Sequence, residues 1–199
     1  WLGLHIDEQY GGAGCGLLEL VTVVEEFGRV NAPGSFVPTV TASAVIAAAG
    51  NEAQRARWLP GLVDGSVTGA VDVDSSVTAH GDEFSGDALA IGAGLADVLV
   101  LSVGGDVIVV PADAAGVRVD VPGNLDPTRR SGRVSLAGVG AAGVDILPGA
   151  AALAKSLART IFAAEAIGGA QDCVEHAVAY AKVREQFGRT IGTFQAVKH

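Results

Sequence analysis

The sequence predicts an α+β protein in which a helical part, a β part and a second helical part follow one another. Apolar residues recur at helical spacing before residue 65 and after residue 150. Between them, residues 66–149 consist of short Val-rich runs separated by Gly, Asp and Pro, which is typical of strands and turns. With 49% apolar residues the chain can build a sizeable core. We therefore expect three domains, at residues 1–65, 66–149 and 150–199.

Three helices are predicted in the first part. The first has an apolar stripe and should end near Gly28. The residues of this stripe are Leu17, Leu18, Val21, Val24 and Phe27. An Ala-rich helix from about Thr41 to Ala49 should end at Gly50. The third should follow Asn51, a favourable N-terminal cap, and stop at Pro60-Gly61.

The middle part should contain a small sheet with many turns. Its three clearest strands are residues 67–73, 97–103 and 106–110, and residues 117–119, 133–136 and 143–147 could extend the sheet. Gly104-Gly105 lies between two of these runs and predicts a two-residue hairpin turn. The segment Gly92-Ala-Gly94 is too short for a phosphate-binding loop, so we interpret it as a turn.

One long helix is predicted from about Ala150 to Arg184, because Leu153, Leu157 and Ile161 are spaced by four residues. Gly168-Gly169 lies in its middle, where each glycine costs about 1 kcal/mol relative to alanine. The helix should therefore either kink at this point or pack unusually close to a neighbour.

Composition excludes several classes of function. The net charge of −9 disfavours a nucleic-acid partner and offers no basic patch for a membrane surface. No apolar run is long enough to span a membrane. Two widely separated cysteines, Cys15 and Cys173, form no disulfide or metal pattern and predict a cytoplasmic protein. The absence of Met and an ending inside a new helical start predict a fragment of a longer protein.

The densest motif lies at the end of the chain, where Arg184 is followed by Gln186-Phe187-Gly188, Ile191-Gly192 and Phe194-Gln195. This block resembles the flavin-contacting signature of the acyl-CoA dehydrogenase family. Supporting phrases occur in the family's order at residues 8–12, 25–29, 57–60 and 126–129, namely Glu-Gln-Tyr-Gly-Gly, Glu-Glu-Phe-Gly-Arg, Arg-Trp-Leu-Pro and Asp-Pro-Thr-Arg. The resemblance covers essentially the whole chain, and in particular it is to the flavin-poor subunit of hetero-oligomeric actinobacterial enzymes.

The resemblance implies an N-terminal helical domain, a central β-barrel-like domain and the start of a C-terminal helical bundle. It also implies FAD as cofactor, held by a neighbouring subunit. The residues of this chain that would contact that FAD are Arg184, Gln186, Phe187, Phe194 and Gln195. From the residues alone, Arg184 could instead pair with Glu185 or Asp172 at the surface. The two phenylalanines could equally be hydrophobic anchors of a helix–turn–helix.

Arg159 is a second candidate, because it interrupts an apolar stretch and a buried arginine needs a partner. The resemblance places it near the acyl-CoA site, whereas the alternative is a salt bridge to Glu165 or to the β part. Arg159 and Arg184 would face the same way, about 37 Å apart along a straight helix.

The chain departs from the family pattern where the family wraps its own flavin. The Pro-Gly-Ser turn of one loop is missing from residues 69–81, and residues 88–94 lack the aromatic residue of a second segment. The flavin ring pocket should therefore be incomplete. Ala158 stands where some members carry the catalytic Glu, so no catalytic base can be assigned here.

The resulting hypothesis is a subunit of an acyl-CoA dehydrogenase that completes a partner's flavin site and oxidises an acyl-CoA thioester to the 2,3-enoyl-CoA. An electron-transfer flavoprotein would be the electron acceptor, and the substrate class would be fatty acyl or steroid side-chain thioesters. Two alternatives remain open: a homo-oligomeric enzyme that holds its own FAD, and a non-catalytic scaffold of the same fold.

Overall fold

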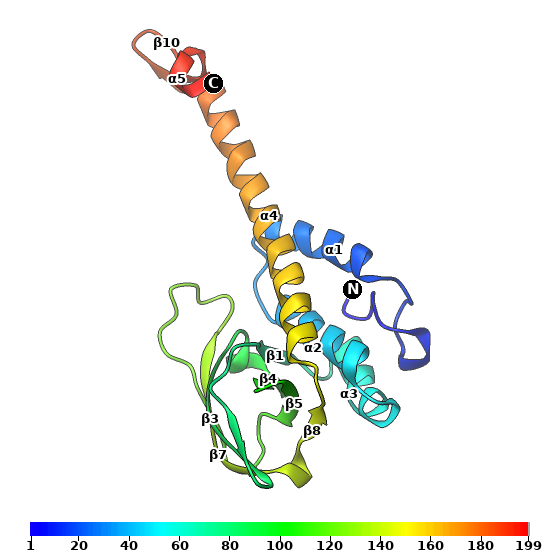
Figure 1. Cartoon of the computed structure of the whole chain (residues 1–199). Helices are drawn as coiled ribbons and strands as arrows, with labels where there is room; N and C mark the ends of the chain where they lie inside the picture. Colours follow the sequence, from blue (N-terminus) through cyan, green and yellow to red (C-terminus); the bar gives the residue numbers. More distant parts are fainter. Residues whose placement is uncertain (199) are drawn as a thin grey trace.

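The computed structural model describes residues 1–198 and confirms the α+β class, with helices first, strands next and a long helix after them (Figure 1). The N-terminal elements are the short 3₁₀ turn η1 (Glu8–Tyr10) and helices α1 (Leu17–Arg29), α2 (Phe36–Ala49) and α3 (Glu52–Asp64). The division into three domains stays a prediction.

Capping explains some helix ends and tertiary packing explains others. Asn51 caps α3 as predicted, since its Oδ1 accepts a hydrogen bond from the backbone N–H of Gln54 at 2.9 Å. The predicted end at Pro60-Gly61 is wrong: Leu62 is fully buried and the helix continues past it. The helix ends only at Gly65, which has a φ of 82° and adopts the left-handed conformation.

The buried face of α1 differs from the predicted stripe. Leu20, Val24 and Gly28 are buried, whereas Leu18 is 73% exposed. The predicted end near Gly28 is confirmed, since the helix ends one residue later at Arg29. The stripe was misplaced because the closest neighbour of α1 is another helix that approaches at a glycine, a residue without a hydrophobic side chain.

The eight strands within residues 66–149 form two four-stranded sheets, so the barrel implied by the resemblance is not closed. One sheet has the order β1-β4-β5-β8, formed by Gly69–Asp72, Val98–Val103, Asp106–Pro111 and Asp145–Leu147. The other has the order β2-β3-β7-β6, formed by Thr78–His80, Glu83–Ala90, Gly132–Gly140 and Val117–Asp120. Each sheet keeps its own edge strands, and a shared apolar core with Phe84, Leu99 and Ile108 lies between the two sheets.

The predicted hairpin at Gly104-Gly105 is confirmed, because Val103 pairs with Asp106 across it. Strand β3 was not predicted. Its pairing with β7 shifts register at Gly86, which has a φ of 134°, so the alternation of buried and exposed residues is interrupted. A bulge of this kind hides a strand from any pattern of strict period two.

Helix α4 (Ala151–Val183) is continuous over 33 residues, so Gly168-Gly169 does not break it. A Cβ on Gly168 would lie 1.9 Å from the carbonyl oxygen of Glu25 in α1. In return, a Cβ on Gly28 would lie 2.0 Å from the carbonyl oxygen of Glu165. Of the two predicted explanations for the glycine pair, close packing is therefore the correct one.

Helix α4 projects beyond the rest of the molecule. Its first half packs near α1 and α2, and its second half extends away from the sheets (Figure 1). The last buried residue of the helix is Gly168. Whatever follows α4 is thereby held far from the β strands. Among the described residues, no helix combines the length and the apolarity needed to cross a membrane.

His5 is a partly buried titratable side chain of the N-terminal part. Its Nε2 lies 3.1 Å from the hydroxyl oxygen of Ser43 in α2, and its Nδ1 is buried without a hydrogen-bond partner. Burial lowers the pKa of His5 from 6.5 to about 4. The folded protein therefore binds the proton more weakly than the unfolded chain does.

This difference predicts a loss of stability in acid. The contribution of His5 is complete above pH 6.5 and is lost as the pH falls towards 4, with a total on the order of 3 kcal/mol. Denaturant unfolding measured across this pH range should show the loss, and His5→Gln should remove it. His80→Gln, at an exposed histidine, is the control. An unchanged pH profile in His5→Gln would contradict the assignment.

Candidate functional site

The five residues predicted to contact a cofactor lie together at the end of α4. After Arg184, strands β9 (Glu185–Gln186) and β10 (Arg189–Thr190) form a short hairpin, and the turn η4 (Ile191–Thr193) leads into α5 (Gln195–Lys198). The backbone N–H of Ile191 donates to the carbonyl of Arg184 at 2.8 Å and closes the unit. We call residues 184–198 the terminal hairpin. It carries Arg184, Gln186, Phe187, Phe194 and Gln195.

Phe187 lies at the tip in a conformation that is unfavourable for a bulky residue. Phe187 and Gly188 have φ values of 53° and 74°, which is the two-residue turn with both central residues left-handed. This conformation costs about 1–2 kcal/mol for a residue with a Cβ. The side chain is 91% exposed, so Phe187 is not an anchor within this part of the chain. An exposed aromatic residue in a strained turn is typical of a contact surface.

The guanidinium of Arg184 is available to a ligand. The residue is exposed and forms no ion pair within residues 1–198, so neither alternative partner is found. Asp172 instead lies 3.2 Å from His176. The two glutamines are also exposed, and the side-chain amide of Gln186 donates to the carbonyl of Glu185 at 2.8 Å.

Charge is distributed unevenly along the chain. Residues 182–198 contain four basic side chains and one acidic one, whereas residues 66–149 contain four basic and eleven acidic ones. The basic residues near the terminal hairpin favour an anion there, and the acidic excess disfavours one at the β strands.

Arg159 does not belong to this cluster. It lies 25 positions before Arg184, about 37 Å away along α4. The expected burial is wrong, because Ala158 and Ile161 occupy the buried face and Arg159 is exposed. The alternative salt bridge to Glu165 is not found either, since Glu165 pairs with Arg129. A substrate role for Arg159 stays a prediction.

The second candidate region is a groove on the outer face of the sheet β2-β3-β7-β6. Three adjoining cavities of about 430, 510 and 420 Å³ form it. Leu89 and Arg133 line both of the first two, and Ile91, Asn124 and Ser131 line both of the last two. We call these joined cavities the sheet groove. Part of its wall comes from residues 69–81 and 88–94, where the sequence departs from the family pattern, and most of the rest comes from residues 120–133.

One end of the sheet groove is lined by three of the protein's own carboxylates. Asp72 accepts a hydrogen bond from the backbone N–H of Leu89 at 2.6 Å, and Asp74 pairs with Lys155 of α4. Asp87 also lines this end and accepts from the hydroxyl of Ser135 at 2.6 Å. Of the charged residues that line this end, three are carboxylates and one, Arg133, is basic, so the net charge is of the wrong sign for a phosphate. These residues do not fit an anionic dinucleotide.

The other end is closed by an ion pair that sequence reasoning missed. Arg129 of the loop before β7 pairs with Glu165 of α4 and also donates to the carbonyl of Gly34 at 3.4 Å. Burial raises the pKa of Glu165, although Arg129 beside it acts in the opposite direction. Phe162 and Leu125 line the same cavity. Gly34, Arg129 and Glu165 are far apart in the chain, so no local sequence pattern predicts their contact.

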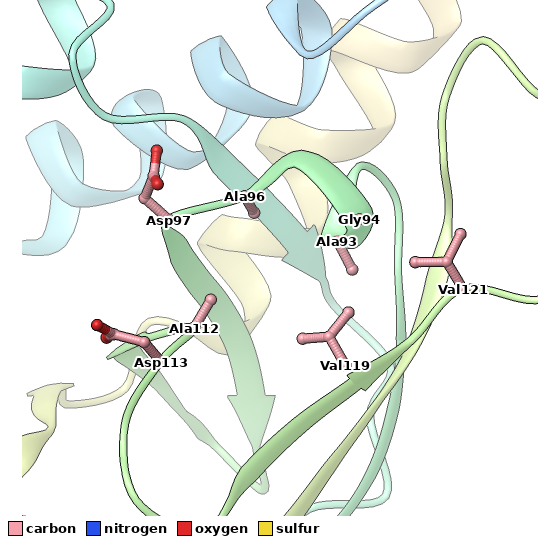
Figure 2. A pocket seen from close by; sticks show the side chains of 8 residues that line it. All are labelled: Ala93, Gly94, Ala96, Asp97, Ala112, Asp113, Val119 and Val121. Atoms are coloured by element: carbon pink, nitrogen blue, oxygen red, sulfur yellow. The ribbon is translucent and has the colours of Figure 1, made fainter.

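A separate cavity of about 480 Å³ lies between the short turn η2 (Ala93–Leu95) and strand β6 (Figure 2). Asp97 and Asp113 are its only charged lining residues, and the other six are Ala, Gly or Val. Asp97 already accepts hydrogen bonds from the N–H and the hydroxyl of Thr68, both at 2.8 Å. No residue predicted to be functional lines this cavity, so it adds nothing to the candidate site.

Two family models match the chain, one at each end. The model of the acyl-CoA dehydrogenase N-terminal domain matches residues 1–66, and that of the C-terminal domain matches residues 150–199. The chain is 36% identical to acyl-CoA dehydrogenase IpdE2 of Mycobacterium tuberculosis, covering 98% of the chain and 54% of the relative. It is 32% identical to FadE34 of the same organism, covering 99% of the chain and 27% of the relative. The chain thus spans about half of the first relative's length and less of the second.

Solved structures share the arrangement described above. A variant of the Tcur3481-Tcur3483 steroid ACAD superposes with a TM-score of 0.87 at 33% identity, over 100% of this chain and 59% of that one. The ChsE4-ChsE5 complex from Mycobacterium tuberculosis gives 0.86 at 25% identity, over 99% and 58%. Together with the matching domain models and the motif on the terminal hairpin, these likenesses establish that the chain belongs to the acyl-CoA dehydrogenase family.

Proposed function

We propose that this chain is part of a subunit that completes a flavin site held by a different subunit of an acyl-CoA dehydrogenase. The complex would oxidise an acyl-CoA thioester to the 2,3-enoyl-CoA, with FAD accepting the hydride. The three parts at residues 1–65, 66–149 and 150–199 would be its domains, the last continuing into a helical bundle.

The observation that carries the proposal is the separation of two surfaces by one rigid helix. The sheet groove meets α4 at Phe162 and Glu165, whereas the terminal hairpin begins at Arg184. The 19 residues from Glu165 to Arg184 span about 28 Å of continuous helix. The terminal hairpin therefore lies far from its own groove, and this separation supports a ligand held by another subunit.

The two surfaces also differ in their fit to FAD. The terminal hairpin offers exposed Arg184, two exposed amides and an aromatic tip, all suited to a dinucleotide. Arg184 would hold a phosphate oxygen, while Phe187 and Phe194 would exclude water from the adenosine part. In the sheet groove, the carboxylates of Asp72 and Asp74 already bond to Leu89 and Lys155 of the same chain. Their negative charge disfavours an anionic ligand, so the sheet groove would not bind FAD. No catalytic base is assigned among residues 1–198.

The names of related structures support a mixed assembly. ChsE4-ChsE5 is a complex of two named chains, and the Tcur3481-Tcur3483 enzyme likewise carries two names and is called a steroid ACAD. We therefore propose a second acyl-CoA dehydrogenase subunit as partner and an acyl-CoA with a steroid or fatty acyl group as substrate. An electron-transfer flavoprotein as acceptor, and the cytoplasm as location, are further parts of the proposal.

The test is the amount of flavin bound per purified chain. The full-length parent protein would be expressed alone and together with a second acyl-CoA dehydrogenase subunit of the same organism, and flavin absorbance would be compared with chain concentration. We expect no flavin on the protein alone and one flavin per pair of chains in the complex.

The two alternatives predict different numbers. A homo-oligomeric enzyme would hold one flavin per chain when expressed alone, which would overturn the proposal. A non-catalytic scaffold would leave flavin binding of its partner independent of this chain. If the partner binds the same amount of flavin alone as in the complex, the result would support the scaffold.

A further inference from the structure

Arg189 makes a contact within the terminal hairpin that the family motif does not account for. Its guanidinium carbon lies 4.0 Å from the centre of the Phe194 ring, over the ring face. The rings of Phe194 and Phe187 meet in a T-shaped arrangement, with centroids 6.3 Å apart and planes at 82°. Arg189, Phe194 and Phe187 thus form a continuous stack of three side chains.

This row of side chains connects the exposed tip to the turn that follows the hairpin. Phe187 is 91% exposed. Among residues 1–198, its ring pairs with the aromatic ring of Phe194. Phe194 is itself only half-buried and belongs to the connection between η4 and α5. Arg189 lies in β10, directly opposite Gln186 of β9. It therefore ties the strand side of the hairpin to the turn that follows it.

The guanidinium of Arg189 is not used elsewhere. It forms no ion pair within the described part of the chain, and the residue is exposed. A planar cation over an aromatic face is favoured electrostatically, and it orders both groups. A neutral residue at this position would leave Phe194 and Phe187 free to change rotamer.

We propose that Arg189 is a positioning residue, which acts through Phe194 to hold Phe187 in the orientation that receives the partner's dinucleotide. This inference rests on the proposed function, because it assigns the ligand of the same surface. It differs from a direct role: Arg189 would stabilise the binding conformation and would not itself hold a phosphate.

The first test uses the full-length protein alone and needs no flavin. Hydrogen exchange of the backbone amides of residues 186–191 should be faster in Arg189→Ala than in the unaltered protein. Arg118→Ala, at an exposed arginine of β6, is the matched control and should leave these rates unchanged. Unchanged exchange in Arg189→Ala would overturn the positioning role.

The second test measures FAD affinity of the apo-complex by titration. Arg189→Ala should weaken binding about fivefold, while kcat at saturating FAD stays that of the unaltered complex. Arg189→Lys keeps the charge without the planar fork, so it should restore binding only in part. In a double-mutant cycle, Arg189→Ala should have little further effect once Phe194→Leu is present. Additive effects, or full recovery in Arg189→Lys, would show a direct charge contact and overturn the inference.

Failure of the proposed function gives a different result. An unaltered complex that binds no FAD at all would overturn both ideas, whereas FAD binding by the unaltered complex and equally by Arg189→Ala would overturn the inference alone. Size-exclusion chromatography of each complex would confirm that the subunits still assemble, so a change in affinity is not a loss of assembly.

Discussion

Arg184→Ala is expected to weaken FAD binding by the complex of this chain and its partner about 10- to 100-fold. A guanidinium can form two hydrogen bonds with a phosphate, each assisted by charge, and alanine replaces neither. Arg184 is exposed at the end of α4 and has no ion pair within residues 1–198, so the change removes no internal contact of that kind. Fluorescence titration of the apo-complex with FAD would measure the effect.

Arg118→Ala provides the matched control for this experiment, because it removes the same charge from an exposed position in β6. Its affinity for FAD should equal that of the unaltered complex. Raising the salt concentration should weaken FAD binding more in the unaltered complex than in Arg184→Ala, since one screened charge is then missing. Equal affinities of the Arg184 and Arg118 variants would refute the role of Arg184.

Gly168→Ala is expected to destabilise the protein by about 1–3 kcal/mol or more, although alanine is the better helix former. The new Cβ would lie 1.9 Å from the carbonyl oxygen of Glu25, a backbone atom that cannot rotate away. Helices α1 and α4 would have to move apart, which would open the core around Leu20 and Ile161. Denaturant unfolding would report the change in free energy.

The neighbouring glycine is a control of the same chemistry. A Cβ on Gly169 would have the carbonyl oxygen of Gly28 as its nearest neighbour at 3.6 Å, an ordinary van der Waals distance. Gly169→Ala should therefore be neutral or stabilise the protein by up to about 1 kcal/mol. Equal stability of the two variants would mean that the contact between α1 and α4 is looser than described.

Prediction from sequence succeeded where the signal was local. The cap at Asn51, the hairpin at Gly104-Gly105 and the long helix after residue 150 each depend on residues a few positions apart. Prediction failed where distant residues decide the outcome. Helix α3 continues past Pro60-Gly61, where Leu62 is buried, and β3 was missed because its bulge breaks the alternation.

The candidate site shows the same limit. The motif around Arg184 was found because its members follow one another along the chain, and the structure brings them together on one hairpin. The burial expected for Arg159 was wrong, because which face of a helix is covered depends on what packs against it. The ion pairs Asp74–Lys155 and Arg129–Glu165 join residues 81 and 36 positions apart. No spacing pattern in the sequence predicts either pair.

The sequence by itself determined the order of helices and strands, the family and the charge contrast between the chain's end and its middle. The order of elements and the charge contrast follow from composition and short-range periodicity, whereas the family was recognised from the motif around Arg184. Three features were decided only by the tertiary structure. Two glycines allow α1 and α4 to pack closely, and carboxylates line one end of the sheet groove. Helix α4 also holds the terminal hairpin far from that groove. Such facts depend on which distant surfaces meet, because the free energy of burial and hydrogen bonding is realised only in contacts between them.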